Sequence, residues 1–255
     1  MEKINRTSFQ GITNIIRFNW HFYAFAFAFV LVLFFLKEFL TEPFSSYLII
    51  LIFLAFFSTV LSLAASYYIY DCSDLYTLNW LNHFTLSSNT SLVNIHAGFD
   101  ETSALLLQKF PDSCLTVFDF YDSKKHTEIS IERARKAYPA YPGTKKTGTQ
   151  NIPLKKDSVD LICLILSAHE IRQTEERISF FQQLENSLKT NGKIIVVEHL
   201  RDLPNFLVYN FGFLHFHSEK TWLESFKAAD LTVTKKTKIT PFISTFTLKK
   251  NGSAS

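Results

Sequence analysis

Residues 92–121 read LVNIHAGFDETSALLLQKFPDSCLTVFDFY. The stretch begins with a β-rich run, continues with apolar residues in helical register, and ends with a second β-rich run. A strand, a helix and a strand in this order predict two parallel strands with the helix packed on one face of their sheet. This unit predicts an α/β fold for the part of the chain around it.

The same alternation continues toward the C-terminus. Helices are expected at 126–138, 174–189 and 218–230, and strands within 143–150 and at 158–167, 193–200, 231–239 and 241–250. Gly192 suits a left-handed position after the second of these helices. Only Thr240–Pro241 joins the last two strands, which must be antiparallel because a parallel crossover needs about a dozen residues. Residues 91–250 are therefore predicted to form a doubly wound, mostly parallel seven-stranded sheet with a C-terminal antiparallel pair.

Two long uncharged stretches precede this domain. Neither stretch contains Asp, Glu, Lys or Arg: the first spans the 19 residues 18–36, and the second spans the 28 residues 43–70. A bilayer core of ~30 Å needs about 20 apolar helical residues. Residues 1–70 are expected to be a membrane anchor, a hairpin of two transmembrane helices at about 18–36 and 44–70. A signal peptide is disfavoured, because no small-residue cleavage site follows the first stretch.

Charge around the stretches predicts their orientation. Lys3, Arg6 and Arg17 precede the first stretch, whereas the connection to the second contains only Lys37 as a basic residue. Because basic residues favour the cytoplasmic side, the chain is expected to be an integral protein of the cytoplasmic (inner) membrane with its domain in the cytoplasm. Residues 71–90 are expected to be an interfacial segment or a linker, and residues 251–255 a disordered tail.

Composition excludes several classes of function. Lys and Arg number 26 against 23 Asp and Glu, which gives a net charge of +3 without a basic block. No nucleic-acid partner is therefore expected. The three cysteines, Cys72, Cys114 and Cys163, form neither a disulfide framework nor a CxxC metal motif. No feature of the sequence specifies an oligomeric state.

The order of elements over residues 90–250 resembles the class I S-adenosylmethionine-dependent methyltransferases. In that family a glycine-rich turn follows the first strand, and LVNIHAGFDET matches it with Gly98 as the one glycine kept. Asn94 stands at the family's acidic position, and His96 and Asp100 stand at two of its glycine positions. Asp119, which lies 21 residues after Gly98, occurs where the family binds the ribose hydroxyls.

Two further stretches carry the resemblance. TGTQNIPLKKDSVDLI (147–162) is similar to the family's region between the third and fourth strands, and LENSLKTNGKIIVVEHL (184–200) to that around the fifth. The resemblance implies S-adenosylmethionine as the cofactor. It also implies the following cofactor-binding residues: Asn94, His96, Gly98, Asp119, Thr149, Gln150, Asn151 and Ser167. Asn94 and His96 alternate onto one face of their strand, and both are expected to face the cofactor.

Candidate catalytic residues follow the fourth strand. His169 is predicted to be the base, because an unperturbed histidine pKa of ~6.5 lies close to cytoplasmic pH. Glu170 is expected to orient that ring or to bind an acceptor hydroxyl. The alternative for His169 is a helix-capping or core histidine. No metal site is predicted, although His215 and His217, with His169 and Glu198 further away, are conceivable ligands.

The anchor and the aromatic stretch NFLVYNFGFLHFHS (205–218), a candidate lid, indicate the substrate class. A hydrophobic small-molecule or lipid-like acceptor at the lipid bilayer is expected, with O-methylation slightly favoured. The alternative is a methyltransferase-like membrane scaffold that has lost catalysis. It is motivated by the replacements at Asn94, His96 and Asp100.

Overall fold

A computed structural model describes residues 6–125 and 128–252. Its sheet contains β1 (Ser91–His96), β2 (Cys114–Asp119), β3 (Lys145–Lys146), β4 (Val159–Ile165), β5 (Leu188–His199), β6 (Leu231–Thr240) and β7 (Ile243–Lys250). The strand order is β3-β2-β1-β4-β5-β7-β6. β7 is antiparallel to both of its neighbours, and the other pairs are parallel. The predicted doubly wound sheet with its antiparallel end pair is confirmed.

Strand register brings the candidate site together. His96 at the end of β1 pairs with Asp119 at the end of β2, and Asn94 pairs with Cys163 of β4. Parallel strands place their carboxyl ends at one edge of the sheet, where ligands bind in open α/β folds. The loops after β1, β2 and β4 therefore converge at this edge.

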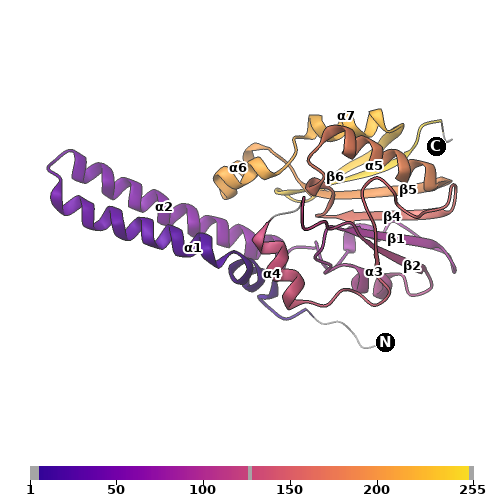
Figure 1. The fold of residues 1–255 in the computed structure, drawn as a ribbon, viewed down its shortest axis with the longest axis horizontal. Helices are drawn as coiled ribbons and strands as arrows, with labels where there is room; N and C mark the ends of the chain where they lie inside the picture. The colour runs from indigo at the N-terminus through magenta and orange to yellow at the C-terminus, as the bar shows by residue number, and fades with distance from the viewer. Residues whose placement is uncertain (1–5, 126–127, 253–255) are drawn as a thin grey trace.

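Helices cover both faces of the sheet (Figure 1). Helices α5 (Thr174–Ser187) and α7 (Glu219–Ala228) lie on one face and α3 (Ser103–Lys109) on the other, whereas α4 (Ile129–Ala137) and α6 (Leu203–Tyr209) lie toward the hairpin (Figure 1). Phe181 of α5 and Trp222 of α7 are fully buried in the core cluster on one face. Leu106 of α3 is buried in the cluster on the other face. Burial of large aromatic and aliphatic side chains on both faces supplies the main stabilisation of such a layered fold.

The segment between the hairpin and β1 belongs to the second of these core clusters. Leu75, Leu78 and Leu81 each have 1% or less of their surface exposed and pack with the residues of the sheet. The packed core therefore begins before residue 91, and residues 75–81 are not a free linker. At the other end of the chain, residues 251–252 form a turn. Residues 253–255 of the expected tail lie outside the described residues.

Gly192 differs from its expected role. It lies inside β5 rather than after a helix, and its φ is not in the left-handed region. A Cβ atom at this position would be 2.8 Å from the carbonyl oxygen of Val159, so the neighbouring strand requires glycine here. The register of β4 and β5 shifts at this point, which is typical of a bulge.

The N-terminal hairpin extends away from the domain (Figure 1). Its helices are α1 (Gln10–Leu36) and α2 (Phe44–Tyr67), of 27 and 24 residues. By length and composition both are able to cross a membrane, and only 6% of each apolar window is buried within the structure. Most of the surface of both helices is therefore exposed rather than packed against the rest of the described chain.

Helix α1 begins earlier than expected because a carboxylate directly after α2 caps it. The carboxylate of Asp71 accepts hydrogen bonds from the backbone N–H groups of Gly11 and Ile12, at 2.7 and 2.8 Å. A carboxylate at a helix N-terminus satisfies its unpaired N–H groups and complements its dipole. Asn19 has non-helical dihedral angles (φ −112°, ψ 16°), which mark a kink. Residues 10–18, here called the foot of α1, lie before this kink.

Candidate functional site

The turn after β1 requires a glycine at position 98. Gly98 has a φ of +100°, and a Cβ atom there would lie 2.9 Å from the ring of Tyr121 and 3.1 Å from Nη1 of Arg135. Only glycine adopts this conformation without strain in so little space. The local structure therefore requires Gly98, the one glycine that this turn shares with the family pattern.

Asn94 and His96 are buried at this turn. The Asn94 amide nitrogen donates hydrogen bonds to the hydroxyls of Thr102 and Ser103, at 3.0 and 2.8 Å. Nδ1 of His96 accepts a hydrogen bond from the Gly98 N–H at 3.2 Å. Burial lowers the pKa of His96, so the ring is neutral at pH 7 and carries its proton on Nε2.

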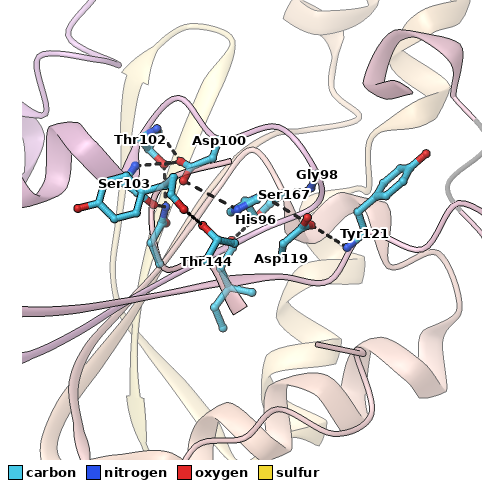
Figure 2. Close-up of polar contacts among 12 residues, drawn as sticks. His96, Gly98, Asp100, Thr102, Ser103, Asp119, Tyr121, Thr144 and Ser167 are labelled. Carbon is cyan, nitrogen blue, oxygen red and sulfur yellow. Dashed lines mark hydrogen bonds and ion pairs between the residues drawn. The ribbon is translucent and has the colours of Figure 1, made fainter. Parts of the chain in front are cut away.

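Three buried polar atoms at this turn have no hydrogen-bond partner among the described residues: Asn94 Oδ1, His96 Nε2 and Asp100 Oδ2. Figure 2 shows His96 lying between Asp100 and Asp119; Nε2 is 3.9 Å from Asp100 Oδ2, and Nδ1 is 3.8 Å from Asp119 Oδ1. Buried polar atoms are rarely left without partners. Two acceptors and one N–H donor match the ammonium and carboxylate of an amino-acid group, so these residues fit the methionine end of the implied cofactor.

Asp119 is at the expected position but already has a cationic partner. Its Oδ1 accepts the Tyr121 N–H at 2.9 Å, and its Oδ2 accepts a hydrogen bond from Arg135 at 2.6 Å. Arg135 also donates to the Gly98 carbonyl at 3.0 Å, and its guanidinium lies 4.5 Å from the centre of the Tyr121 ring. Arg135 of α4 is therefore ion-paired with Asp119, the residue that the resemblance predicts to bind the ribose hydroxyls.

The remaining cofactor candidates lie around this edge. Ser167 is buried, and its hydroxyl donates to the Ile95 carbonyl at 2.8 Å. The buried Thr149 hydroxyl donates to a carboxylate oxygen of Glu176. Gln150 and Asn151 are exposed in a turn closed by the Gly148–Asn151 bridge. The two hydroxyls thus hold the loops in place, while the two amides are open to solvent.

His169 and Glu170 belong to a second polar cluster. Nδ1 of His169 lies 2.6 Å from Glu198 Oε2, and the His169 backbone N–H donates to Glu198 Oε1 at 3.1 Å. Nε2 of the same ring lies 3.3 Å from Glu170 Oε1. Glu198, fully buried at the end of β5, therefore fixes the orientation of the His169 ring.

His215 completes this cluster from the loop after α6. Its Nε2 is 3.4 Å from Glu170 Oε1, and its Nδ1 is 2.9 Å from Glu128 Oε1. The guanidinium of Arg172 contacts the carbonyl and the ring of His215. His217 lies elsewhere, with its Nε2 3.3 Å from Nη1 of Arg177, so His215 and His217 do not converge.

The cluster changes the protonation expected for His169. Burial lowers its pKa, but the carboxylates of Glu198 and Glu170 outweigh this effect and raise it to about 10. Burial opposes ionisation of Glu170, yet the two neighbouring imidazoles hold its pKa far below the usual range. His169 is therefore an imidazolium at neutral pH, and the ordinary pKa on which its prediction as a base rests does not apply.

A cavity of about 720 Å³ joins this cluster to the foot of α1. Its lining includes Phe18 and Phe22 of α1, Phe99 from the turn after β1, and Phe216. Its polar end is formed by His169, Glu170, His215 and Glu128. This volume and the apolar walls are typical of a small-molecule site.

Sequence reasoning missed several residues that shape the site. Arg135 and Glu128 gave no signal, because their roles depend on where α4 packs. The contribution of the foot of α1 also gave no signal, since all of its residues except Phe18 precede the uncharged stretch. Glu198 was recognisable from the sequence, because it is a carboxylate at the end of the apolar run IIVVE, but its pairing with His169 was not.

The sequence matches no protein-family model, and no curated protein matches it. The fold is similar to that of solved structures. A SAM-dependent methyltransferase from Aquifex aeolicus is 14% identical with a TM-score of 0.50, over 69% of this chain and 91% of that chain. A putative methyltransferase solved in complex with the Haloferax volcanii Trm112 methyltransferase activator is 12% identical with a TM-score of 0.52, over 72% and 91% of the respective chains.

A third structure, PigF with SAH, is 12% identical with a TM-score of 0.50, over 69% of this chain and 61% of that chain. The chain therefore has the fold of the S-adenosylmethionine-dependent methyltransferases, with an N-terminal helical hairpin before it.

Proposed function

We propose that the protein is a membrane-anchored S-adenosylmethionine-dependent methyltransferase that acts on an apolar small molecule or lipid-like acceptor at the cytoplasmic face of the membrane. One observation carries this proposal: the cavity at the carboxyl edge of the sheet is walled partly by the foot of α1, which continues into the apolar hairpin. A soluble acceptor does not require a membrane helix in the wall of its pocket.

The turn after β1 binds the cofactor in this proposal. S-adenosylmethionine, when bound, supplies an electrophilic methyl group on a sulfonium sulfur. His96 Nε2–H is the donor for its carboxylate, and the oxygens of Asn94 and Asp100 are the acceptors for its ammonium. Asp119 accepts hydrogen bonds from the ribose hydroxyls, and residues 149–151 flank the adenine.

The cavity orients the acceptor. The aromatic walls of Phe18, Phe22 and Phe99 exclude water from it and hold an apolar body in place. At the polar end, the His169 imidazolium favours an ionised acceptor oxygen, because a nearby positive charge lowers the pKa of a phenol or carboxyl group. This supports O-methylation. The protein orients the acceptor and stabilises its charge, and the acceptor's proton passes to solvent as the ionised form binds.

The surface around the hairpin suits contact with a bilayer. Helix α6 and the following turn, η5 (Asn210–His215), lie beside the base of the hairpin (Figure 1). They expose the apolar side chains Leu203, Phe206, Leu207, Phe211 and Leu214, with Phe211 85% exposed. Large exposed apolar patches mark interaction sites. In the proposal this patch rests on the cytoplasmic leaflet, so an apolar acceptor reaches the cavity without crossing water.

A scaffold without catalysis is the second candidate. The pairing of Asp119 with Arg135, at 2.6 Å, favours it, because the ribose acid is occupied by a side chain of the same protein. The unpartnered atoms of His96 and Asp100 favour cofactor binding, because a site without a ligand has no reason to bury them unpaired.

Calorimetric titration of the detergent-solubilised full-length protein with S-adenosylmethionine separates the two candidates. The enzyme hypothesis predicts binding that weakens at least tenfold in Asp119→Ala. Asp112→Ala, an exposed aspartate just before β2, is the matched control and is expected to bind like the wild type. Absence of binding to wild-type protein shown to be folded would refute the enzyme hypothesis and favour the scaffold.

A further inference from the structure

We propose that His169, Glu170 and His215 bind one divalent first-row transition-metal ion at the polar end of the cavity. The inference concerns metal binding alone and stands independently of methyl transfer. The three side chains come from two segments far apart in the sequence, the loop after β4 and the turn η5. Their ligand atoms all lie within 4.8 Å of one another.

The distances match a metal's coordination sphere. Nε2 of His169 and Nε2 of His215 lie 3.3 and 3.4 Å from Oε1 of Glu170. Ligands bound at ~2.0–2.1 Å in a tetrahedral zinc site are about 3.3 Å from each other. The two ring nitrogens are therefore already at coordination spacing from the carboxylate oxygen.

Each histidine also has the carboxylate partner that metal-binding histidines usually have. Nδ1 of His169 lies 2.6 Å from Glu198, and Nδ1 of His215 lies 2.9 Å from Glu128. A carboxylate on Nδ1 holds the proton there and leaves the Nε2 lone pair for a metal. Both rings thus direct the same nitrogen toward Glu170.

The charges of the cluster balance with a divalent ion. Glu128, Glu170 and Glu198 contribute three negative charges, and Arg172 contributes one positive charge beside His215. Metal binding releases the Nε2 proton of the His169 imidazolium. With both imidazoles then neutral, one divalent cation brings the sum to zero. Arg172 contacts both ring nitrogens of His215, but its side chain is exposed, so it is able to leave the ring when the metal binds while keeping its hydrogen bond to the His215 carbonyl.

The donor set narrows the choice of metal. Two imidazoles and one carboxylate suit zinc and other first-row ions, whereas magnesium and calcium prefer sites made of oxygen atoms alone. Three protein ligands leave at least one coordination position open. Because the ligands line the cavity, that position faces the space in which an acceptor oxygen would lie.

Zinc binding to the full-length protein tests the proposal. The protein is purified in detergent, its affinity tag is removed, and it is stripped of metal with a chelator before titration with ZnCl2. Calorimetry and elemental analysis after buffer exchange are expected to give one Zn²⁺ per chain. In a parallel sample, Co²⁺ is expected to give visible absorption typical of a tetrahedral or five-coordinate site.

Variants identify the ligands. His215→Gln and Glu170→Gln are expected to weaken zinc binding at least tenfold, and Glu128→Gln about tenfold through its effect on His215. His83→Ala removes an exposed histidine outside the cluster and is expected to bind like the wild type. Circular dichroism checks that each variant is folded. A wild-type protein without stoichiometric zinc, or folded His215→Gln and Glu170→Gln variants with wild-type affinity, would overturn the proposal.

Discussion

The hydroxyl of Tyr70, at the base of the hairpin, lies 3.0 Å from Nε2 of His199, at the end of β5. The other ring nitrogen, Nδ1, lies 3.0 Å from Asn205 Oδ1. The Asn205 amide nitrogen donates to Asp202 and to the Phe242 carbonyl, so its oxygen must be an acceptor. His199 therefore carries its proton on Nδ1 and accepts a hydrogen bond from Tyr70. This bond joins the hairpin to the core of the domain.

Tyr70→Phe is expected to destabilise the protein. The change leaves Nε2 of His199 buried without a donor, which costs about 1–3 kcal/mol. Thermal unfolding of the detergent-solubilised protein should show a lower Tm. Tyr68→Phe, two residues earlier and 45% exposed, is the control and should leave the Tm unchanged. Equal Tm values for the two variants would show that the bond does not hold the hairpin to the domain.

Acid should weaken the same contact. Burial lowers the pKa of His199 to about 4. The unfolded chain binds the proton near pH 6.5, so stability from the neutral ring is complete above that pH and is lost as the pH falls toward 4. The loss is about 3 kcal/mol. Unfolding free energies of wild type and His199→Gln, measured from pH 7 to pH 4, should differ less and less on acidification; a constant difference would contradict the assignment.

The sequence predicted the sheet because its signals are local. Residues 159–165 form a strand buried on both faces, and their apolar run shows it. The order of strands and helices then leaves few topologies. Leu75, Leu78 and Leu81 were not recognised as core, since no regular helix connects them. The prediction for Gly192 was wrong. A glycine is required there because the backbone comes close to Val159 on the neighbouring strand, and not because a helix ends there.

The site was predictable only where strand ends define it. His96 and Asp119 are register partners, so a pattern of strands is enough to bring them together. Arg135 and Glu128 depend on the rotation and position of α4, and nothing in the local sequence specifies either. The role of Phe18 in the cavity depends on how the hairpin docks, which is a property of tertiary contacts alone.

Arg135→Ala should tighten cofactor binding. Arg135 donates a hydrogen bond to Asp119 Oδ2 at 2.6 Å, and the ribose hydroxyls must displace it. Hydrogen bonds to charged groups contribute about 1.5–3 kcal/mol, so its removal should strengthen binding about tenfold or more. Lys136→Ala changes the next, exposed residue and serves as the control in the same calorimetric titration. Weaker binding by Arg135→Ala would mean that Arg135 itself contacts the cofactor.

His96→Gly should have the opposite effect. The change restores the glycine of the sequence pattern but removes the buried, unpartnered Nε2–H donor. If that donor binds the methionine carboxylate, affinity for S-adenosylmethionine should fall by ~1 kcal/mol or more, about fivefold. A gain in affinity would show that His96 obstructs the site rather than serving it.

Transfer of a labelled methyl group into the lipid phase tests the central claim most directly. The full-length protein, reconstituted into nanodiscs, is incubated with methyl-tritiated S-adenosylmethionine and an organic extract of its native membranes. We expect label in the organic phase and matching release of S-adenosylhomocysteine with the wild type, and about tenfold less of both with Asp119→Ala at a cofactor concentration well below the wild-type Kd. Label that enters only water-soluble products, or a folded wild-type protein that binds S-adenosylmethionine yet transfers no label, would contradict a methyltransferase for an apolar acceptor.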